Sequence, residues 1–159
     1  MKLITTLAII GILSFTFNLN GQCNNFGFDV QLPETSSHGP NYLLGSAIVV
    51  PTPGTLTTVS IIALAGGPNY QVAIYDDLAG NPGNLLTSST GTLINGLNVI
   101  DVPDIAVTAG TYYMMAVFDV TASIGYETGV TETVWYETFT YGTALLDPFG
   151  TPLTYTGQR

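Results

Sequence analysis

The chain has 159 residues and a formal net charge of −9, with 11 acidic residues and only two basic ones. Without a cationic surface it has nothing to neutralise phosphates, which excludes nucleic-acid binding and attraction to anionic lipid headgroups. Hydrophobic residues make up 46% of the sequence, which excludes a disordered chain.

The first predicted element is an apolar N-terminal segment. Lys2 precedes an apolar run over 3–17, and polar residues follow up to Gly21. A basic start, an apolar run too short to span a bilayer and a polar end are typical of a secretory signal peptide. We therefore expect residues 1–21 to be a signal peptide, residues 22–159 to form one secreted domain, and the protein to work extracellularly or at the cell surface.

Removing this segment takes Lys2 away and leaves Arg159 as the only basic residue, so the formal charge of the mature chain becomes about −10. Catalysis that depends on a lysine is thereby excluded. Cys23 is the only cysteine, so no disulfide can form within the chain. We expect a free thiol in an N-terminal strand, with lipidation and an intermolecular disulfide as the alternatives.

The mature chain consists of short runs rich in Val, Ile, Thr, Tyr and Phe, separated by Gly, Pro and Asn. This punctuation indicates an all-β sandwich or barrel. Apolar residues alternate over 26–32 and predict a first strand, and the polar stretch 34–40 is expected to be an exposed loop that carries the only histidine, His38. Further strands are expected over 42–50, 56–65, 70–75, 85–89, 97–102, 111–120, 125–128 and 134–141, with an edge strand within 147–159.

Two of these segments are the most informative about how the strands pack into sheets. The segment 42–50 is mostly apolar on both faces, as in a central strand. The segment 111–120 is the strongest strand, and alternation places one apolar set on a single face. That set is Tyr112, Met114, Ala116, Phe118 and Val120. Nine or ten strands in one domain predict an antiparallel two-sheet β-sandwich of jelly-roll kind.

Three pieces of the sequence occur in an order that is known from other proteins. They are Pro-Gly-Thr-Leu-Thr-Thr-Val-Ser-Ile at 53–61, Val-Ala-Ile-Tyr-Asp-Asp-Leu-Ala-Gly-Asn-Pro-Gly-Asn-Leu-Leu at 72–86, and Val-Thr-Ala-Gly-Thr-Tyr-Tyr at 107–113. In this order they resemble a β-sandwich module that recurs in secreted bacterial proteins, and the signal peptide resembles those of Bacteroidetes-type bacteria. The resemblance implies an accessory or adhesive domain rather than a catalytic one.

The loop after 70–75 is the candidate metal site. It combines Asp76, Asp77 and Asn81, and calcium prefers carboxylate and carbonyl oxygens on a loop. These three residues are the predicted ligands of a structural calcium ion, and no other cofactor is expected. Ordinary turn chemistry is the alternative, because Asp and Asn also bond to nearby backbone and Pro82-Gly83 suits a type II turn.

Aromatic residues near the C-terminus form the candidate ligand site. Trp135 and Phe139 share one face of a strand and suit the core, while Tyr136 falls on the other face. With nearby Tyr126, Tyr136 could stack on a sugar ring. The predicted ligand-binding set is therefore Tyr126, Trp135 and Tyr136.

Catalytic residues are not predicted. A catalytic nucleophile needs a base beside it. The only histidine, His38, stands in a polar stretch, and the sequence contains no Gly-x-Ser-x-Gly motif. Glu127, Glu132 and Glu137 are spaced by five, which places neighbours on opposite faces of one strand. Glycoside hydrolysis needs two carboxylates close together. These glutamates could therefore act as a catalytic pair only if a hairpin brought two of them together.

We therefore expect a non-catalytic secreted or cell-surface module for adhesion, recognition or structural support. Its partner would be an extracellular glycan or a surface protein. A carbohydrate-binding module and a small secreted glycan-active enzyme are the alternatives.

Overall fold

The computed structural model describes residue 26 and residues 31–158, and these form ten strands. The strands are β1 (Glu34–His38), β2 (Tyr42–Val50), β3 (Gly54–Ala63), β4 (Asn69–Leu78), β5 (Asn81–Thr92), β6 (Gly96–Val107), β7 (Gly110–Phe118), β8 (Ala122–Tyr126), β9 (Thr131–Thr138) and β10 (Leu153–Gln158). Within these described residues no helix is long and apolar enough to cross a membrane.

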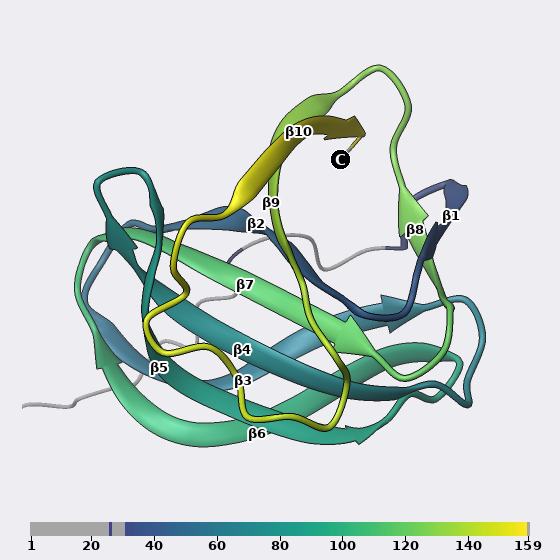
Figure 1. The fold of residues 1–159 in the computed structure, drawn as a ribbon, viewed down its shortest axis with the longest axis horizontal. Coiled ribbons are helices and arrows are strands. Elements are labelled where there is room, and N and C mark those ends of the chain that lie inside the picture. Colours follow the sequence, from purple (N-terminus) through teal and green to yellow (C-terminus); the bar gives the residue numbers. More distant parts are fainter. Residues whose placement is uncertain (1–25, 27–30, 159) are drawn as a thin grey trace, which may run out of the picture.

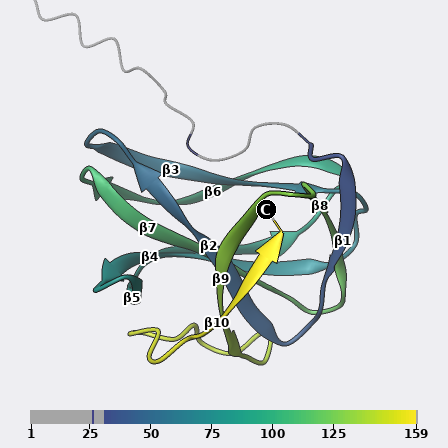
Figure 2. The same ribbon diagram turned by 90° about the horizontal axis from the view of Figure 1, so that it is seen from above.

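The strands make two antiparallel sheets that pack face to face (Figures 1 and 2). The four-stranded sheet has the order β1-β8-β3-β6, and the six-stranded sheet has the order β10-β9-β2-β7-β4-β5. The prediction of an all-β, two-sheet antiparallel sandwich is confirmed. The expected signal peptide (1–21), Cys23 and most of the expected strand at 26–32 lie outside the described residues.

The six-stranded sheet is apolar on both faces. One face packs against the four-stranded sheet and forms the inner core, which includes Val72, Ile74, Tyr112 and Phe118. Met114 and Ala116 are half-buried on the same face of β7, as their alternation predicted. Val120, expected on this face as well, lies beyond the end of β7 and is exposed.

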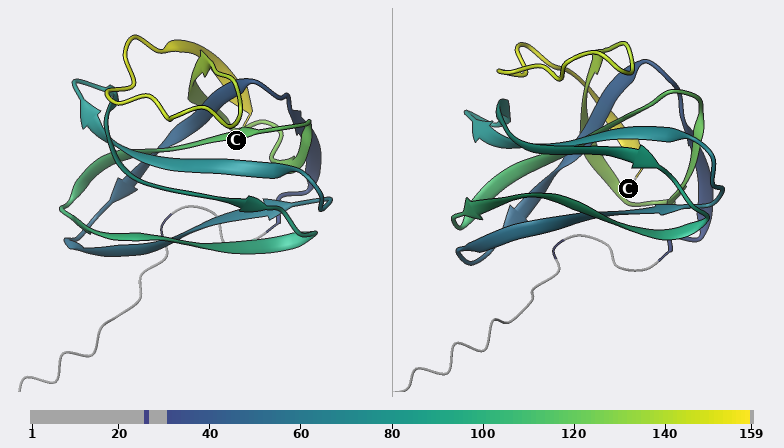
Figure 3. Two further views of the ribbon diagram at one scale, coloured as in Figure 1. Left: turned by 60° about the horizontal axis from the view of Figure 1, so that its bottom comes forward. Right: turned by 90° about the horizontal axis from the view of Figure 1, so that it is seen from below.

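The opposite face of the six-stranded sheet forms an outer core. Its buried members are Leu43, Ala73, Tyr75, Tyr113, Met115, Val117, Phe139 and Phe149. The chain over 139–152 lies across this face, on the side away from the four-stranded sheet (Figure 3). This second core explains why the sequence of β2 is apolar at successive positions, since both sides of that strand are covered.

Hydrogen bonds hold the covering segment in place. The Gln71 side chain accepts from the Gly142 amide at 2.7 Å and donates to the Thr143 carbonyl at 3.1 Å. The Phe149 amide donates to the Gly83 carbonyl at 2.8 Å. The segment is therefore bonded to the sheet by backbone groups as well as packed on it.

The turn between β4 and β5 differs from the prediction. Ala79 has φ 54° and Gly80 has φ 83°. The chain therefore reverses at two residues that both have positive φ, as in a type I′ hairpin. Pro82 and Gly83 lie within β5 and are buried. The predicted type II turn at Pro82-Gly83 is wrong, because the Asp77 carboxylate accepts from the Gly80 amide at 3.1 Å and stabilises the earlier turn.

The first described strand also differs from the prediction. Residues 34–38 form β1, which pairs antiparallel with β8, although the sequence is polar. His38, expected in an exposed loop, is only 5% exposed and packs edge-on against Phe118 with ring centroids 4.7 Å apart. Its Nε2–H donates to the Tyr42 carbonyl at 3.0 Å. Burial lowers the pKa of His38, and the hydrogen bond to Tyr42 opposes this only in part.

Candidate functional site

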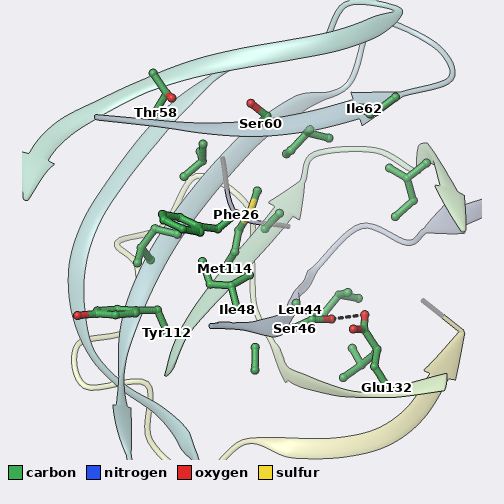
Figure 4. A pocket seen from close by; sticks show the side chains of 18 of the residues that line it. Phe26, Leu44, Ser46, Ile48, Thr58, Ser60, Ile62, Tyr112, Met114 and Glu132 are labelled. Carbon is green, nitrogen blue, oxygen red and sulfur yellow. Dashed lines mark hydrogen bonds between the residues drawn. The ribbon is translucent and has the colours of Figure 1, made fainter. Parts of the chain in front are cut away.

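A groove of about 1550 Å³ lies between the two sheets. Its floor is the inner face of β2 and β7, with Ile48, Met114 and Ala116, and its opposite wall is β3 (Figure 4). Phe26 and Leu32 also line it. The groove exists because β3 and β8 diverge. They pair only at Ala63 with Ile124, and next to this pair the Leu64 amide donates to the Ser123 carbonyl at 2.9 Å.

The divergence leaves one edge of β3 open. Along its other edge β3 pairs with β6 from Gly54 to Ala63, with one register irregularity between Leu56 and Thr58. On the groove side, no strand among the described residues pairs with Gly54–Ile62. The regular stretch Thr58–Ile62 therefore presents backbone groups toward the groove without a described partner strand.

The open edge of β3 also lacks the features that normally prevent pairing with another chain. Exposed edges are usually protected by lysine, proline or inward-pointing charges. Thr58–Ile62 reads Thr-Val-Ser-Ile-Ile, which has neither a charge nor a proline. The neighbouring edge strand β6 carries Asp101, Pro103 and Asp104, all exposed. Among the described residues, the β6 edge of this sheet thus carries charges and a proline, whereas the groove-side edge of β3 over Thr58–Ile62 has neither a partner strand nor such residues.

The three residues of the predicted ligand site separate onto two faces. Tyr126 lines the groove, and Tyr136 lies beside it at the junction of β2, β9 and β10. Trp135 faces the outer core, where its ring packs against Tyr113 with centroids 4.9 Å apart. The structure therefore places Tyr126 and Tyr136 on the groove side and Trp135 on the opposite face.

Two further tyrosines lie next to Tyr136 that the sequence analysis did not select. Tyr42 begins β2 and Tyr155 lies in β10, and with Leu44 the three tyrosines line a notch of about 350 Å³. The alternation of Tyr42, Leu44 and Ser46 on β2 could have placed Tyr42 on the inner face. The pairing of β10 with β9, which brings Tyr155 close to Tyr136, is a long-range contact that strand periodicity does not reveal.

The candidate glutamates also divide between the two faces. Glu132 lines the groove and accepts from the Ser46 hydroxyl at 2.6 Å. Glu137 stands opposite Leu43 of the outer core. Glu132 and Glu137 therefore lie on opposite faces of β9, as the spacing predicted, and make no common pair of carboxylates.

The predicted calcium ligands lie at the β4–β5 hairpin. The Asp77 carboxylate accepts from the Gly80 amide and from the Tyr113 hydroxyl, the latter at 2.9 Å. Asp76 accepts from the Asn84 amide and side chain. Among the described residues no group of three or more His, Cys, Asp or Glu side chains could hold a metal ion. Local hydrogen bonding accounts for both aspartates, and calcium binding at this loop stays a prediction.

The hydrogen bond to Asp77 also affects Tyr113. Burial, followed by this bond and the charge of Asp77, raises the pKa of Tyr113 to about 12. Its hydroxyl is therefore protonated at neutral pH and acts as the donor.

Comparison with known proteins gives no relative. No family model, curated protein or solved structure matches the chain.

Proposed function

We propose that this protein is a non-catalytic secreted or cell-surface module for adhesion and recognition that binds an extended polypeptide segment. The segment would add to the four-stranded sheet as a strand beside β3. One observation carries this proposal: the edge of β3 over Thr58–Ile62, which pairs with no strand among the described residues, adjoins an apolar groove. In strand addition the backbone hydrogen bonds supply affinity and the groove receives every second side chain.

The expected setting supports this role. A signal peptide over 1–21 would bring the chain outside the cytoplasm, and the jelly-roll-like modules that the sequence resembles are accessory or adhesive. The mature chain has no lysine to protect a strand edge. An exposed edge of this kind is a hazard inside a crowded cytoplasm, but it is useful for attachment to a surface protein.

The lining of the groove favours a polypeptide over a glycan. Ile48, Met114 and Ala116 form an apolar floor, which suits the alternating side chains of a strand and not the hydroxyl groups of a sugar. A carbohydrate-binding role would depend on the tyrosines at the groove margin. It remains the alternative function.

A synthetic peptide with the sequence of residues 24–33 is a suitable probe, because its apolar residues alternate and Phe26 and Leu32 of the chain itself contact the groove. We expect it to bind the mature chain, with a dissociation constant on the order of 10 μM. Binding should be tighter to a chain that begins at Gln31, because Phe26 is then absent from the groove. Fluorescence anisotropy of the labelled peptide measures the dissociation constant for each of the two chains.

Two controls separate strand addition from simple filling of an apolar groove. The same peptide with N-methyl groups on alternate amides keeps its side chains but cannot donate to β3, and it should not bind. Ser60→Lys adds a charge to β3 and should weaken binding about tenfold. The matched control is Val99→Lys on β6, because Val99 stands directly opposite Ser60 in the register. This substitution should leave peptide binding unchanged. Equal binding of the plain and N-methylated peptides, or no binding of either, would show that the proposal is wrong.

A further inference from the structure

Three tyrosines from adjacent strands meet at the margin of the groove. The tyrosines are Tyr42 of β2, Tyr136 of β9 and Tyr155 of β10, and Leu44 also lines the recess. Tyr136 stands opposite Leu44 in the register, so all four residues belong to the inner face of the six-stranded sheet. We call this recess of about 350 Å³ the tyrosine notch.

The rings form walls rather than a flat platform. Tyr136 meets Tyr42 with centroids 6.2 Å apart and an interplanar angle of 68°, and it meets Tyr155 at 5.7 Å and 65°. Tyr42 is 44% exposed and Tyr155 is 48% exposed, so ring surface is open to a ligand. Three rings at different angles therefore line one recess.

A carboxylate adjoins the notch. Glu132 and Tyr155 both line the groove, and burial, followed by the charges of Tyr136 and Glu132, raises the pKa of the Tyr155 hydroxyl. The Ser46 hydroxyl donates to Glu132 at 2.6 Å and holds this carboxylate in the groove, which shares Leu44 and Tyr155 with the notch. The surrounding domain is strongly acidic, with a formal charge of about −10 after loss of the signal peptide. Both the local and the overall field therefore attract cations.

We propose that the tyrosine notch binds a quaternary ammonium group, with the rings of Tyr42, Tyr136 and Tyr155 around the cation and Glu132 as its counter-charge. A cation within about 6 Å of an aromatic ring face is attracted by the ring quadrupole, and several rings around one recess are typical of sites for methylated ammonium groups. Anionic ligands are repelled here. A flat sugar ring would gain one stacking face at most, because the walls are tilted.

The first experiment compares two ligands of nearly the same shape. Choline and 3,3-dimethyl-1-butanol differ in the central atom, which is a charged nitrogen in one and a neutral carbon in the other. NMR titration of the mature chain should show choline shifting the tyrosine ring signals of the notch, with a dissociation constant on the order of 1 mM. The neutral isostere should bind at least about tenfold more weakly. Equal binding of the two would overturn the proposal.

Variants test the assigned residues. Tyr155→Phe keeps the ring and should change the dissociation constant less than about threefold, whereas Tyr155→Leu should raise it about tenfold. Glu132→Gln keeps an acceptor for Ser46 but removes the charge, and should weaken choline binding about threefold or more. Unchanged melting temperatures would show that the variants fold. Choline binding that survives both Tyr155→Leu and Glu132→Gln would overturn the assignment.

A third set of measurements identifies the source of the group and the competing ligand class. Binding to phosphatidylcholine vesicles as well as to choline would indicate a lipid headgroup, and binding to choline alone would indicate a free solute. Binding of neutral oligosaccharides such as cellohexaose, without binding of choline, would overturn the cation proposal in favour of a glycan. Ser60→Lys should leave choline binding unchanged, because β3 does not line the notch, so this inference and strand addition fail or succeed separately.

Discussion

The two faces of the six-stranded sheet carry similar side chains but have different covers. On the outer face, the segment 139–152 packs Phe139 and Phe149 over the strands and bonds to them through Gln71. On the inner face, the four-stranded sheet covers one end and leaves a groove where β3 and β8 diverge. An apolar strand face is therefore buried only where another segment is available to cover it, and the uncovered part of such a face is a candidate binding surface.

Adjacent methionines of β7 provide the largest expected contrast. Met115 is 0% exposed in the outer core, while Met114 is half-buried and lines the groove. We expect Met115→Ala to lower the free energy of unfolding by about 2–5 kcal/mol, because it leaves a closed cavity. Met114→Ala should cost about 1 kcal/mol or less, because its site is already open to solvent. Urea denaturation of both variants measures the difference.

The same substitution in the same strand controls for backbone effects. Alanine replaces methionine at two consecutive positions of β7, so strand propensity changes equally in both variants. A cost for Met114→Ala as large as that for Met115→Ala would indicate that the groove is closed in solution. That result would remove the basis for strand addition.

Two tyrosines of the outer core give a smaller contrast. The Tyr113 hydroxyl donates to Asp77 at 2.9 Å, whereas the buried Tyr75 hydroxyl has no hydrogen-bond partner among the described residues. Tyr113→Phe should lower the free energy of unfolding by about 1–1.5 kcal/mol through loss of a bond to a charged acceptor. Tyr75→Phe should be neutral or should raise it by up to about 1 kcal/mol, since it removes an unsatisfied polar atom.

Thermal melting of the two Tyr→Phe variants at pH 7 checks this prediction. Both substitutions remove one hydroxyl from a ring that stays buried, so the hydrophobic contribution is nearly the same in each. If Tyr75→Phe destabilises as much as Tyr113→Phe, the Tyr75 hydroxyl has a partner in solution.

The sequence predicts most strands of this fold but not how they are covered. Alternation and turn residues place β2 within its observed bounds, because local periodicity determines which face of a strand is apolar. The strand β1 was missed because Glu34–His38 is polar, and only its pairing with β8 makes it a strand. The covering segment 139–152 is irregular, and nothing in its periodicity shows that it lies on the outer core.

The candidate site depends even more on long-range contacts. Parity on the strand predicts Tyr136 on the face opposite Trp135, which the structure confirms, and ligand binding by Tyr136 stays a prediction. Tyr155 was not selected, because its place beside Tyr136 follows from the pairing of β10 with β9. The open edge of β3 results from the divergence of β3 and β8, which is a property of sheet geometry and has no signature in the sequence.

His38 gives the smallest expected effect, at the boundary between the two sheets. Burial lowers its pKa below the ordinary value of 6.5, so the unfolded chain takes up a proton at a higher pH than the folded protein. The resulting stability is present above pH 6.5 and is lost as the pH falls below it. We expect the free energy of unfolding to drop by about 1 kcal/mol or less between pH 6.5 and 5.5, before most carboxylates titrate. In His38→Gln, which has no titratable side chain at this position, urea denaturation over the same interval should show a flat profile. An equal drop in both proteins would mean that another group causes the acid sensitivity and that the burial of His38 does not.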